Sequence, residues 1–437
     1  MLLKYSVSNF KSIGHNIEFS MLPLEDTDDS FLTEIDTVSG KFKVLRRGAF
    51  FGPNASGKTS FIKSIDFARN YILTGPLTNS ITGVDQFRGN IAELEEITTF
   101  QFMILANKTI YAYGFSLDRY YVHEEWLEVL NSNKFELMFE RHTDESKKTT
   151  VKIYSKYARR NSKERQLAEL LETSIKEKQA GQLFLKKLAE NGSRKADTVF
   201  SWFSNIRVIY PNSSLKNWPF IVQANKEFRE FLSYNLNAVD TGIHQISTSK
   251  SMQLNEFLEK YPLSSDVIKD IEMAESGTIS INGMYFHFKD GEILQIEFEH
   301  LLNGQIIKFN LENESDGTQC IIDILPILFK SVTKENDNLI YIIDELDRSL
   351  HTKLTKYIVN NFIQLNDNSQ LVFTTHDVNL LDLDNFKQEE LWFIDKKTTG
   401  ETSLKPFSDF DVSNKKSILN DYLAGRFGAI PVIKGDN

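Results

Sequence analysis

Residues 44–65 read VLRRGAFFGPNASGKTSFIKSI and hold the most informative pattern of the chain. An apolar run ends at Gly52, and the residues from Gly52 to Thr59 match G-x-x-x-x-G-K-[ST] in full. Apolar side chains then recur at helical spacing, at Phe61 and Ile65. A strand, a glycine-rich turn and a helix in this order predict a phosphate-binding loop in an α/β fold.

The residue types of this loop suit a phosphate chain. Glycine lets the backbone turn successive N–H groups inward, and the following helix directs its positive N-terminal end at the same point. We expect Lys58 to reach the β- and γ-phosphates and the Thr59 hydroxyl to bind magnesium. The predicted nucleotide-binding residues of the loop are Gly52, Pro53, Asn54, Ala55, Ser56, Gly57, Lys58, Thr59 and Ser60. The loop alone does not distinguish adenine from guanine nucleotides.

Two further strands, at 338–344 and 370–376, end in polar residues. In NLIYIIDELDRSLH the apolar run would bring Asp344 to the end of a buried strand, where it can hold magnesium through water. Glu345 would point to the other side, as a general base for an attacking water requires. In QLVFTTH the strand would end at His376, whose imidazole could contact the γ-phosphate or that water. Alternatively, the acid at the end of the first strand could cap the following helix, and His376 could be an ordinary polar residue at a strand end.

The segment Ser315-Asp316-Gly317-Thr318-Gln319 opens an apolar helical pattern. A serine and a glycine at a helix N-terminus can form a second anion-binding end. Taken alone, an ordinary N-cap by Ser315 or Asp316 is the simpler interpretation.

Composition limits the class of protein. The 437 residues are 41% hydrophobic and 25% charged, as in globular proteins, and the net charge of -10 argues against a basic nucleic-acid coat. No apolar run has the length of a membrane span, and the N-terminus lacks the pattern of a secretory signal. The lone Cys320 gives neither an internal disulfide nor a metal-ligand spacing. We therefore expect a cytoplasmic protein without a membrane partner.

The motifs together resemble the series of the ABC ATPases. The order GPNASGKT, ESDGTQ, YIIDELDRSLH and TTH is similar to Walker A, signature, Walker B with D-loop, and switch histidine. The signature is degenerate, with SDGTQ where transporters show SGGQ, and resembles the SxG type of the chromosome-maintenance (SMC) and RecF-like branch. The resemblance implies an ABC-type P-loop ATPase head, with a mixed sheet plus an antiparallel subdomain and a helical insertion.

The resemblance also implies a site shared between two copies. Ser315 and Gly317 of one copy would contact the γ-phosphate held by Lys58 of another, and Asp347 would be the D-loop residue at the interface. The implied domains are an N-terminal ATPase lobe with Walker A at 1–150, a mainly helical insert at 151–275, and a C-terminal lobe at 276–437 with signature, Walker B and switch histidine. Gln86 and Gln101 are the candidates for the Q-loop glutamine, and Phe10 and Lys11 are expected near the nucleotide base.

Several other phrases narrow the resemblance. NFKSIGHNIEFSM, EEWLEV, NAVDTGI and YLAGRFGAIPVI are similar to AbiLi-type ATPases of bacterial anti-phage systems, a group that includes AriA of PARIS and PtuA of Septu. The resemblance implies ATP and Mg²⁺ as cofactors, a homodimer or higher homo-oligomer, a phage-derived trigger, and a separate effector that is a nuclease or toxin.

Two other functions remain open from the sequence. The chain could be a RecF/SMC-like DNA-repair or DNA-binding ATPase, or an OLD-like nuclease component. Residues 377–437 are too few for an appended nuclease domain, so we expect another chain to supply any cleavage. The basic stretch 156–195 could bind nucleic acid, but its interleaved acids favour a solvated, salt-bridged face.

Overall fold

The structure is a computed structural model. It describes residues 1–24, 32–38, 40–76, 81–89, 97–178, 181–211, 218–248, 251–274, 276–281, 284–329, 338–365, 368–383, 385–410 and 418–430. The predicted α/β fold is confirmed, and the chain divides into two compact units.

The first unit joins Met1–Tyr210, Asn338–Leu346 and Asp367–Asn437, and the second joins Pro211–Asp337 and Asp347–Asn366. This division differs from the domain boundaries that we expected. Residues 151–210 of the expected insert belong to the first unit, and the C-terminal stretch is shared between the two units.

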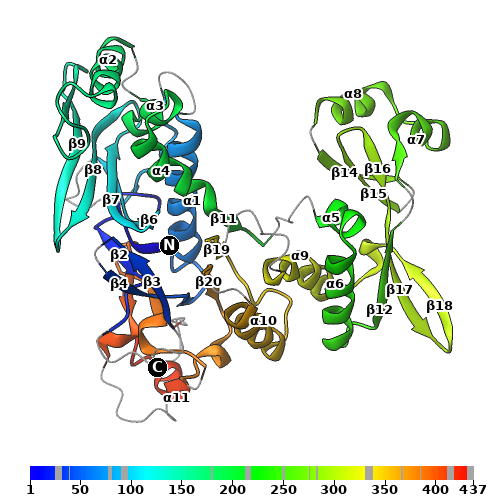
Figure 1. Ribbon diagram of the computed structural model, residues 1–437. Helices are drawn as coiled ribbons and strands as arrows, with labels where there is room; N and C mark the ends of the chain where they lie inside the picture. The colour runs from blue at the N-terminus through cyan, green and yellow to red at the C-terminus, as the bar shows by residue number, and fades with distance from the viewer. Residues whose placement is uncertain are drawn as a thin grey trace. The chain divides into compact units, whose positions relative to one another are not determined.

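A seven-stranded antiparallel sheet forms one layer of the first unit, in the order β10-β9-β8-β7-β6-β1-β2 (Figure 1). Its strands are β1 (Leu2–Ser8), β2 (Ile17–Ser20), β6 (Thr98–Ala106), β7 (Thr109–Leu117), β8 (Val122–Asn131), β9 (Lys134–Thr143) and β10 (Thr149–Ile153). A turn at Asn107–Lys108 joins β6 to β7, and both residues have positive φ, as a two-residue hairpin requires.

The second sheet of this unit has the order β11-β19-β20-β5-β21-β22, and only β22 runs antiparallel to its neighbour. Its strands are β5 (Arg47–Phe51), β11 (Ile206–Ile209), β19 (Ile340–Ile343), β20 (Gln370–Thr375), β21 (Leu391–Lys396) and β22 (Thr402–Pro406). The central strands β5, β19 and β20 are buried along their whole length, which explains their continuous apolar runs. Because parallel strands end at one edge of a sheet, the residues that follow β5, β19 and β20 meet there.

Helix α1 (Lys58–Thr74) packs against both sheets through aromatic side chains. The ring of Phe61 lies 5.7 Å from that of Tyr5 in the antiparallel sheet and 4.9 Å from that of Phe50 in the parallel sheet. The Tyr5 hydroxyl also donates to Ser64 Oγ at 2.8 Å. These contacts fix the start of α1 relative to the end of β5.

The stretch expected to be helical in the first unit contains α2 (Lys163–Lys178), α3 (Phe184–Glu190) and α4 (Arg194–Trp202). Its charges pair with neighbouring acids: Arg165 Nε lies 2.7 Å from Glu169, and Lys156 Nζ lies 2.8 Å from Glu136. This pairing supports the interpretation as a salt-bridged face. The unit is completed by β3 (Leu32–Thr37), β4 (Gly40–Leu45), α11 (Ile418–Leu423) and the short 3₁₀ turns Phe203–Asn205, Val378–Leu380, Gln388–Glu390 and Phe407–Asp409.

The second unit combines helices with two small antiparallel sheets (Figure 1). The sheets have the orders β12-β17-β18 and β13-β16-β15-β14. Their strands are β12 (Ile243–Thr248), β13 (Met252–Gln253), β14 (Ser276–Ile281), β15 (Met284–Lys289), β16 (Glu292–Leu294), β17 (Ile296–Leu302) and β18 (Gln305–Phe309). Asp-Gly and Asn-Gly pairs favour hairpin turns, and those at Asp290–Gly291 and Asn303–Gly304 have positive φ at both residues. A third such pair, at 282–283, lies outside the described residues.

The helices of the second unit are α5 (Trp218–Ala224), α6 (Lys226–Ala238), α7 (Leu254–Lys260), α8 (Ser265–Met273), α9 (Asp316–Ile324) and α10 (Thr352–Leu365), with 3₁₀ turns at Leu311–Asn313 and Leu325–Leu328. The part of the expected helical insert that lies in the second unit also contains β12 and β13. Across the described ranges, no helix combines the length and the apolar character that a membrane span needs.

Candidate nucleotide-binding site

The loop between β5 and α1 is closely packed against neighbouring backbone. Gly57 has φ +113°, and a Cβ there would lie 2.0 Å from Thr402 Oγ1. A Cβ at Gly52 would lie 2.2 Å from the carbonyl oxygen of Ile394. Ala55 has φ 62°, so the loop turns sharply at its exposed tip. Both glycines of the motif are therefore required by the loop's own geometry.

The back of this loop is held by Ser12 and Thr402, neither of which belongs to a sequence motif. Thr402 Oγ1 donates to the carbonyl oxygen of Ser56 at 3.1 Å and lies 2.8 Å from Ser12 Oγ. Thr402 N also donates to the carbonyl oxygen of Ser12 at 2.7 Å. The two residues are 390 positions apart, and no local pattern marks either of them.

The N-terminus of α1, which the structure describes in full, has no side-chain cap at Gly57 and no acid in its first turn. The N–H groups of a first helical turn have no partner within the helix, and their positive end attracts anions. Ser56 is buried at the end of the loop, whereas Asn54 is exposed and Ser60 is half-buried at the start of the helix. The arrangement fits a phosphate group at this end of α1.

Lys58 lies inside the loop with 5% of its surface exposed. Its Nζ donates to the carbonyl oxygens of Gly52 and Pro53, at 2.7 and 3.0 Å. The same Nζ lies 3.4 Å from Nδ1 of His376, which follows β20. The structure thus brings the lysine of the first motif next to the predicted switch histidine.

The hydroxyl of Thr374 connects the acids at the end of β19. Thr59 Oγ1 donates to Asp344 Oδ2 at 2.8 Å, and Thr374 Oγ1 donates to Asp344 Oδ1 at 2.7 Å. The N–H of Glu345 donates to Thr374 Oγ1 at 2.8 Å. The parallel register pairs Ile343 with Phe373, which places Thr374 beside Asp344. In the sequence, the only sign of Thr374 is its place directly after the apolar run of β20.

Asp344 and Glu345 differ in exposure and in backbone conformation. Asp344 is 2% exposed, whereas the side chain of Glu345 is 37% exposed. Glu345 has φ 54°, a conformation that non-glycine residues seldom adopt, so the backbone turns away from the strand at this residue. Its Oε1 lies 4.0 Å from Nε2 of His376. His376 therefore lies between Lys58 and Glu345.

The donors next to the loop suit a magnesium ion. The Thr59 hydroxyl and the Asp344 carboxylate are adjacent oxygen ligands, which Mg²⁺ prefers. In the part of the chain that the structure describes, no group of three or more His, Cys, Asp or Glu side chains could hold a metal. Mg²⁺ in nucleotide sites commonly takes its other ligands from water and phosphate.

The predicted signature and D-loop residues lie together in the second unit. Ser315 is the N-cap of α9, and its Oγ accepts from Thr318 N at 3.2 Å, so the N-cap interpretation is confirmed. A Cβ at Gly317 would lie 2.8 Å from the carbonyl oxygen of Ser349. The turn that contains Asp347 and Ser349 therefore packs against the N-terminus of α9, beside the exposed Ser315.

The remaining expectations concern the Q-loop and the base. Gln101 is exposed within β6. Gln86 follows Asp85, whose carbonyl oxygen accepts a hydrogen bond from Lys11 N at 2.7 Å. Lys11 Nζ also pairs with Asp85 at 2.7 Å. Phe10 is 1% exposed and belongs to the core, so its ring offers no open face for a base.

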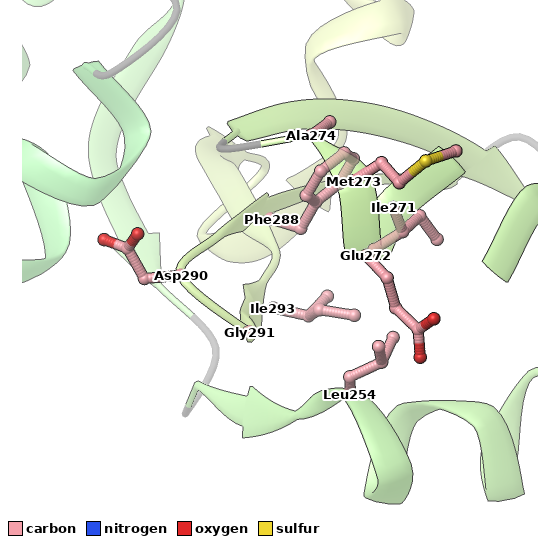
Figure 2. Close-up of a pocket in the computed structure, with 9 residues that line it drawn as sticks. All are labelled: Leu254, Ile271, Glu272, Met273, Ala274, Phe288, Asp290, Gly291 and Ile293. Atoms are coloured by element: carbon pink, nitrogen blue, oxygen red, sulfur yellow. The ribbon is translucent and has the colours of Figure 1, made fainter. Parts of the chain in front are cut away.

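A cavity of about 380 Å³ lies in the second unit and is lined by residues between positions 254 and 293 (Figure 2). It is lined by Leu254, Ile271, Glu272, Met273, Ala274, Phe288, Asp290, Gly291 and Ile293. None of the predicted site residues is among them.

Comparisons with known proteins place the chain in a family. Among solved structures, it is similar to an SMC head bound to the C-winged helix domain of ScpA, with 11% identity and a TM-score of 0.41; the match covers 92% of this chain and 96% of that chain. It is also similar to the SMC head domain from Thermotoga maritima, with 12% identity, coverage of 94% and 99%, and a TM-score of 0.38. No curated protein matches the chain. The family described as "AAA domain, putative AbiEii toxin, Type IV TA system" matches residues 49–382, which is most of the chain and includes every predicted motif. The chain therefore belongs to this AAA_21 family of P-loop ATPases.

Proposed function

We propose that this protein is an ABC-type ATPase that binds and hydrolyses Mg-ATP at an interface between two copies of the chain. The observation that carries the proposal is the grouping of Lys58, Thr59, Asp344, Glu345 and His376 at the carboxyl edge of one parallel sheet. These residues come from three separate segments, and each has the chemistry that one part of phosphoryl transfer to water requires.

Each side chain has a role in this proposal. The loop N–H groups and Lys58 bind the β- and γ-phosphates, while Thr59 and Asp344 hold magnesium, which neutralises phosphate charge when bound. Glu345 orients the attacking water and accepts its proton, because its carboxylate is the exposed one of the pair. His376 contacts the γ-phosphate or the water from between Lys58 and Glu345. Thr374 fixes both acids in these positions.

A second copy would complete the site. Ser315 is exposed at the N-terminus of α9, and Gly317 allows the turn with Asp347 to approach that end closely. A helix N-terminus with a serine hydroxyl is a suitable partner for a γ-phosphate. We infer that Ser315 and Gly317 of one copy contact the phosphate held by Lys58 of the other, and that Asp347 lies at their interface.

The biological role that we propose is the sensing step of an anti-phage system. ATP turnover would rearrange a homo-oligomer that holds a separate effector, either a nuclease or a toxin, until a phage-derived trigger appears. The family description, which names a toxin of a toxin–antitoxin system, supports a setting in which a toxic activity is kept under control. Co-expression with the neighbouring gene in phage-challenged cells tests the role. Equal protection by wild type and Lys58→Ala would contradict an ATP-dependent sensor.

The ATPase itself is tested with purified protein. We expect magnesium-dependent release of phosphate from ATP, and its loss in Lys58→Ala. Lys63 is exposed on the same helix and provides a matched control, so Lys63→Ala should keep full turnover. Equal turnover by Lys58→Ala and Lys63→Ala would overturn the proposed function.

A further inference from the structure

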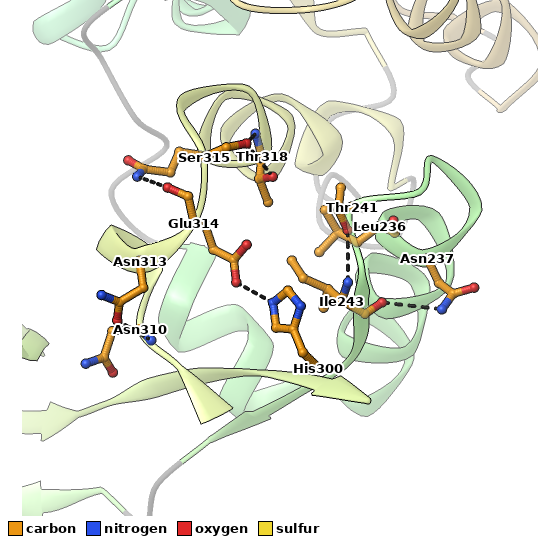
Figure 3. Close-up of polar contacts among 11 residues, drawn as sticks. Leu236, Asn237, Thr241, Ile243, His300, Asn310, Asn313, Glu314, Ser315 and Thr318 are labelled. Atoms are coloured by element: carbon orange, nitrogen blue, oxygen red, sulfur yellow. Dashed lines mark hydrogen bonds and ion pairs between the residues drawn. The ribbon is translucent and has the colours of Figure 1, made fainter. Parts of the chain in front are cut away.

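The residue before the proposed signature serine is a buried acid. The side chain of Glu314 is 5% exposed, although the adjacent Ser315 is exposed. A buried carboxylate is strongly destabilising unless a partner compensates its charge or donates a hydrogen bond to it. His300 of β17 supplies this partner, with Nε2 2.7 Å from Glu314 Oε1 (Figure 3).

The imidazole of His300 is itself held on two further sides. Its ring meets that of Phe309 edge to face, with 4.7 Å between centroids and an interplanar angle of 69°. A Cβ at Gly242, just before β12, would lie 3.3 Å from His300 Nδ1. The histidine side chain is 14% exposed, so its position is set by β17, β18 and the start of β12 together.

Glu314 connects His300 to the first turn of α9 through its backbone hydrogen bonds. Its carbonyl oxygen accepts from Gln319 Nε2 at 2.9 Å, and its N–H donates to the carbonyl oxygen of Leu311 at 3.1 Å. The carbonyl oxygen of Ser315 in turn accepts from Gln319 N at 2.9 Å. The backbone on both sides of Ser315 is therefore fixed, and Glu314 is the residue that ties it to the sheet (Figure 3).

We propose that His300 and Glu314 are positioning residues for Ser315. The pair holds the backbone at residue 314, so that the Ser315 hydroxyl and the first N–H groups of α9 face the γ-phosphate bound by Lys58 of a second copy. This inference rests on the proposed function, because it requires Ser315 to act in a site shared between copies. His300 acts through Glu314 and does not touch the nucleotide.

Three variants measure the effect on turnover. His300→Leu leaves Glu314 buried without its partner, and we expect kcat to fall by about tenfold or more while ATP affinity changes by less than about twofold. His300→Gln, whose amide can still donate to Glu314, should recover much of that loss. His244 is exposed on β12 in the same sheet, so His244→Leu is the matched control and should leave kcat unchanged.

Mixing inactive chains separates this role from a general loss of folding. A Lys58→Ala chain keeps an intact signature segment with Ser315, and a His300→Leu chain keeps an intact phosphate loop. A mixed dimer therefore has one intact site, formed by the phosphate loop of the His300→Leu chain and the signature segment of the Lys58→Ala chain. If sites turn over independently, equal amounts of the two chains should regain about a quarter of wild-type activity, because half of the dimers are mixed and each has one sound site.

A mixture of Lys58→Ala with Ser315→Ala chains is the reference and should regain the same activity. Absence of activity in the reference mixture would overturn the shared site itself. With an active reference, wild-type kcat in His300→Leu would overturn the positioning role. An inactive His300→Leu chain that mixing with Lys58→Ala does not rescue would also overturn it, because His300 would then act within its own chain.

Discussion

Thr59 Oγ1 donates a hydrogen bond to Asp344 Oδ2 at 2.8 Å, although 285 residues separate them. Thr59 is the second residue of α1, which follows β5, and Asp344 follows β19. In the sheet, β20 lies between β5 and β19. The same Asp344 accepts from Thr374 of β20, and the three strands are thereby joined at their carboxyl ends. This relationship is the geometric centre of the proposed site.

The first prediction concerns Gly57→Ala. An alanine there would have φ near +113°, and its Cβ would meet Thr402 Oγ1 at 2.0 Å. We expect ATP affinity to fall by at least about tenfold and stability by more than the roughly 1–3 kcal/mol of backbone strain alone. Isothermal titration with Mg-ATP and urea unfolding measure the two effects.

Gly192→Ala is the control for strain. Gly192 has φ +89°, and, its two chain neighbours aside, no heavy atom of the described chain lies within 4 Å of a Cβ at that position. This variant should lose stability without losing ATP affinity. Equal ATP affinity in Gly57→Ala and wild type would show that the loop tolerates a displaced backbone.

The second prediction concerns Thr374→Val. Valine keeps the shape of threonine but removes the hydroxyl that bonds Asp344 and Glu345. Leaving buried polar groups without partners costs about 1–3 kcal/mol, and we expect kcat to fall by about tenfold as both acids lose their positions. Steady-state ATPase kinetics and thermal unfolding are the measurements.

Thr355→Val is the matched control. Thr355 is also fully buried, on α10, but its hydroxyl has no hydrogen-bond partner among the described residues. Its replacement should be neutral or stabilising and should leave kcat unchanged. The same kcat for Thr374→Val and Thr355→Val would contradict the positioning of the acids by Thr374.

The phosphate loop and the acids were predictable because the information is local. Gly52 to Thr59 form a continuous motif, and the apolar runs before Asp344 and His376 show that their strands are buried on both faces. The α/β fold follows from the alternation of these runs with helical patterns. For the same reason, the hairpin turn at Asn303–Gly304 was evident from its residue types.

The supporting residues were not predictable, because their contacts exist only after folding. Thr374 becomes important through the register of β20 against β19, and Thr402 through the return of β22 to Gly57. β12 was missed because its six residues lie within a long stretch of helical composition. The division into two units was missed because residues 338–346 leave the second unit to complete a sheet in the first.

The third prediction concerns the pH dependence of the second unit. Burial raises the pKa of Asp323, on α9, to about 6, against the effect of a hydrogen bond from Trp218. The folded state therefore holds this proton more tightly than the unfolded state. Stability from this group is fully present below the ordinary pKa of aspartate, near 4, and is lost as pH rises through about 6.

Asp323→Asn should remove this loss, since an amide stays neutral and can still accept from Trp218. We expect the difference in unfolding free energy between the variant and wild type to shift in favour of the variant from pH 4 to pH 8. The size of this shift should be on the order of 2 kcal/mol. Hydrogen exchange of the α9 amide groups, corrected for the intrinsic effect of pH, measures this difference. Asp270→Asn, at an exposed position of α8, should show none. The same pH dependence in Asp323→Asn and wild type would contradict the assignment.

The central claim is that one ATP is enclosed between two copies, and Glu345→Gln tests it most directly. The variant keeps every phosphate contact but lacks the proposed base, so hydrolysis should slow strongly and the closed state should persist. Light scattering coupled to gel filtration, with Mg-ATP present, should give a mass of at least two chains together with retained ATP. A mass that stays at the 50.4 kDa of one chain, with no retained nucleotide, would contradict the account.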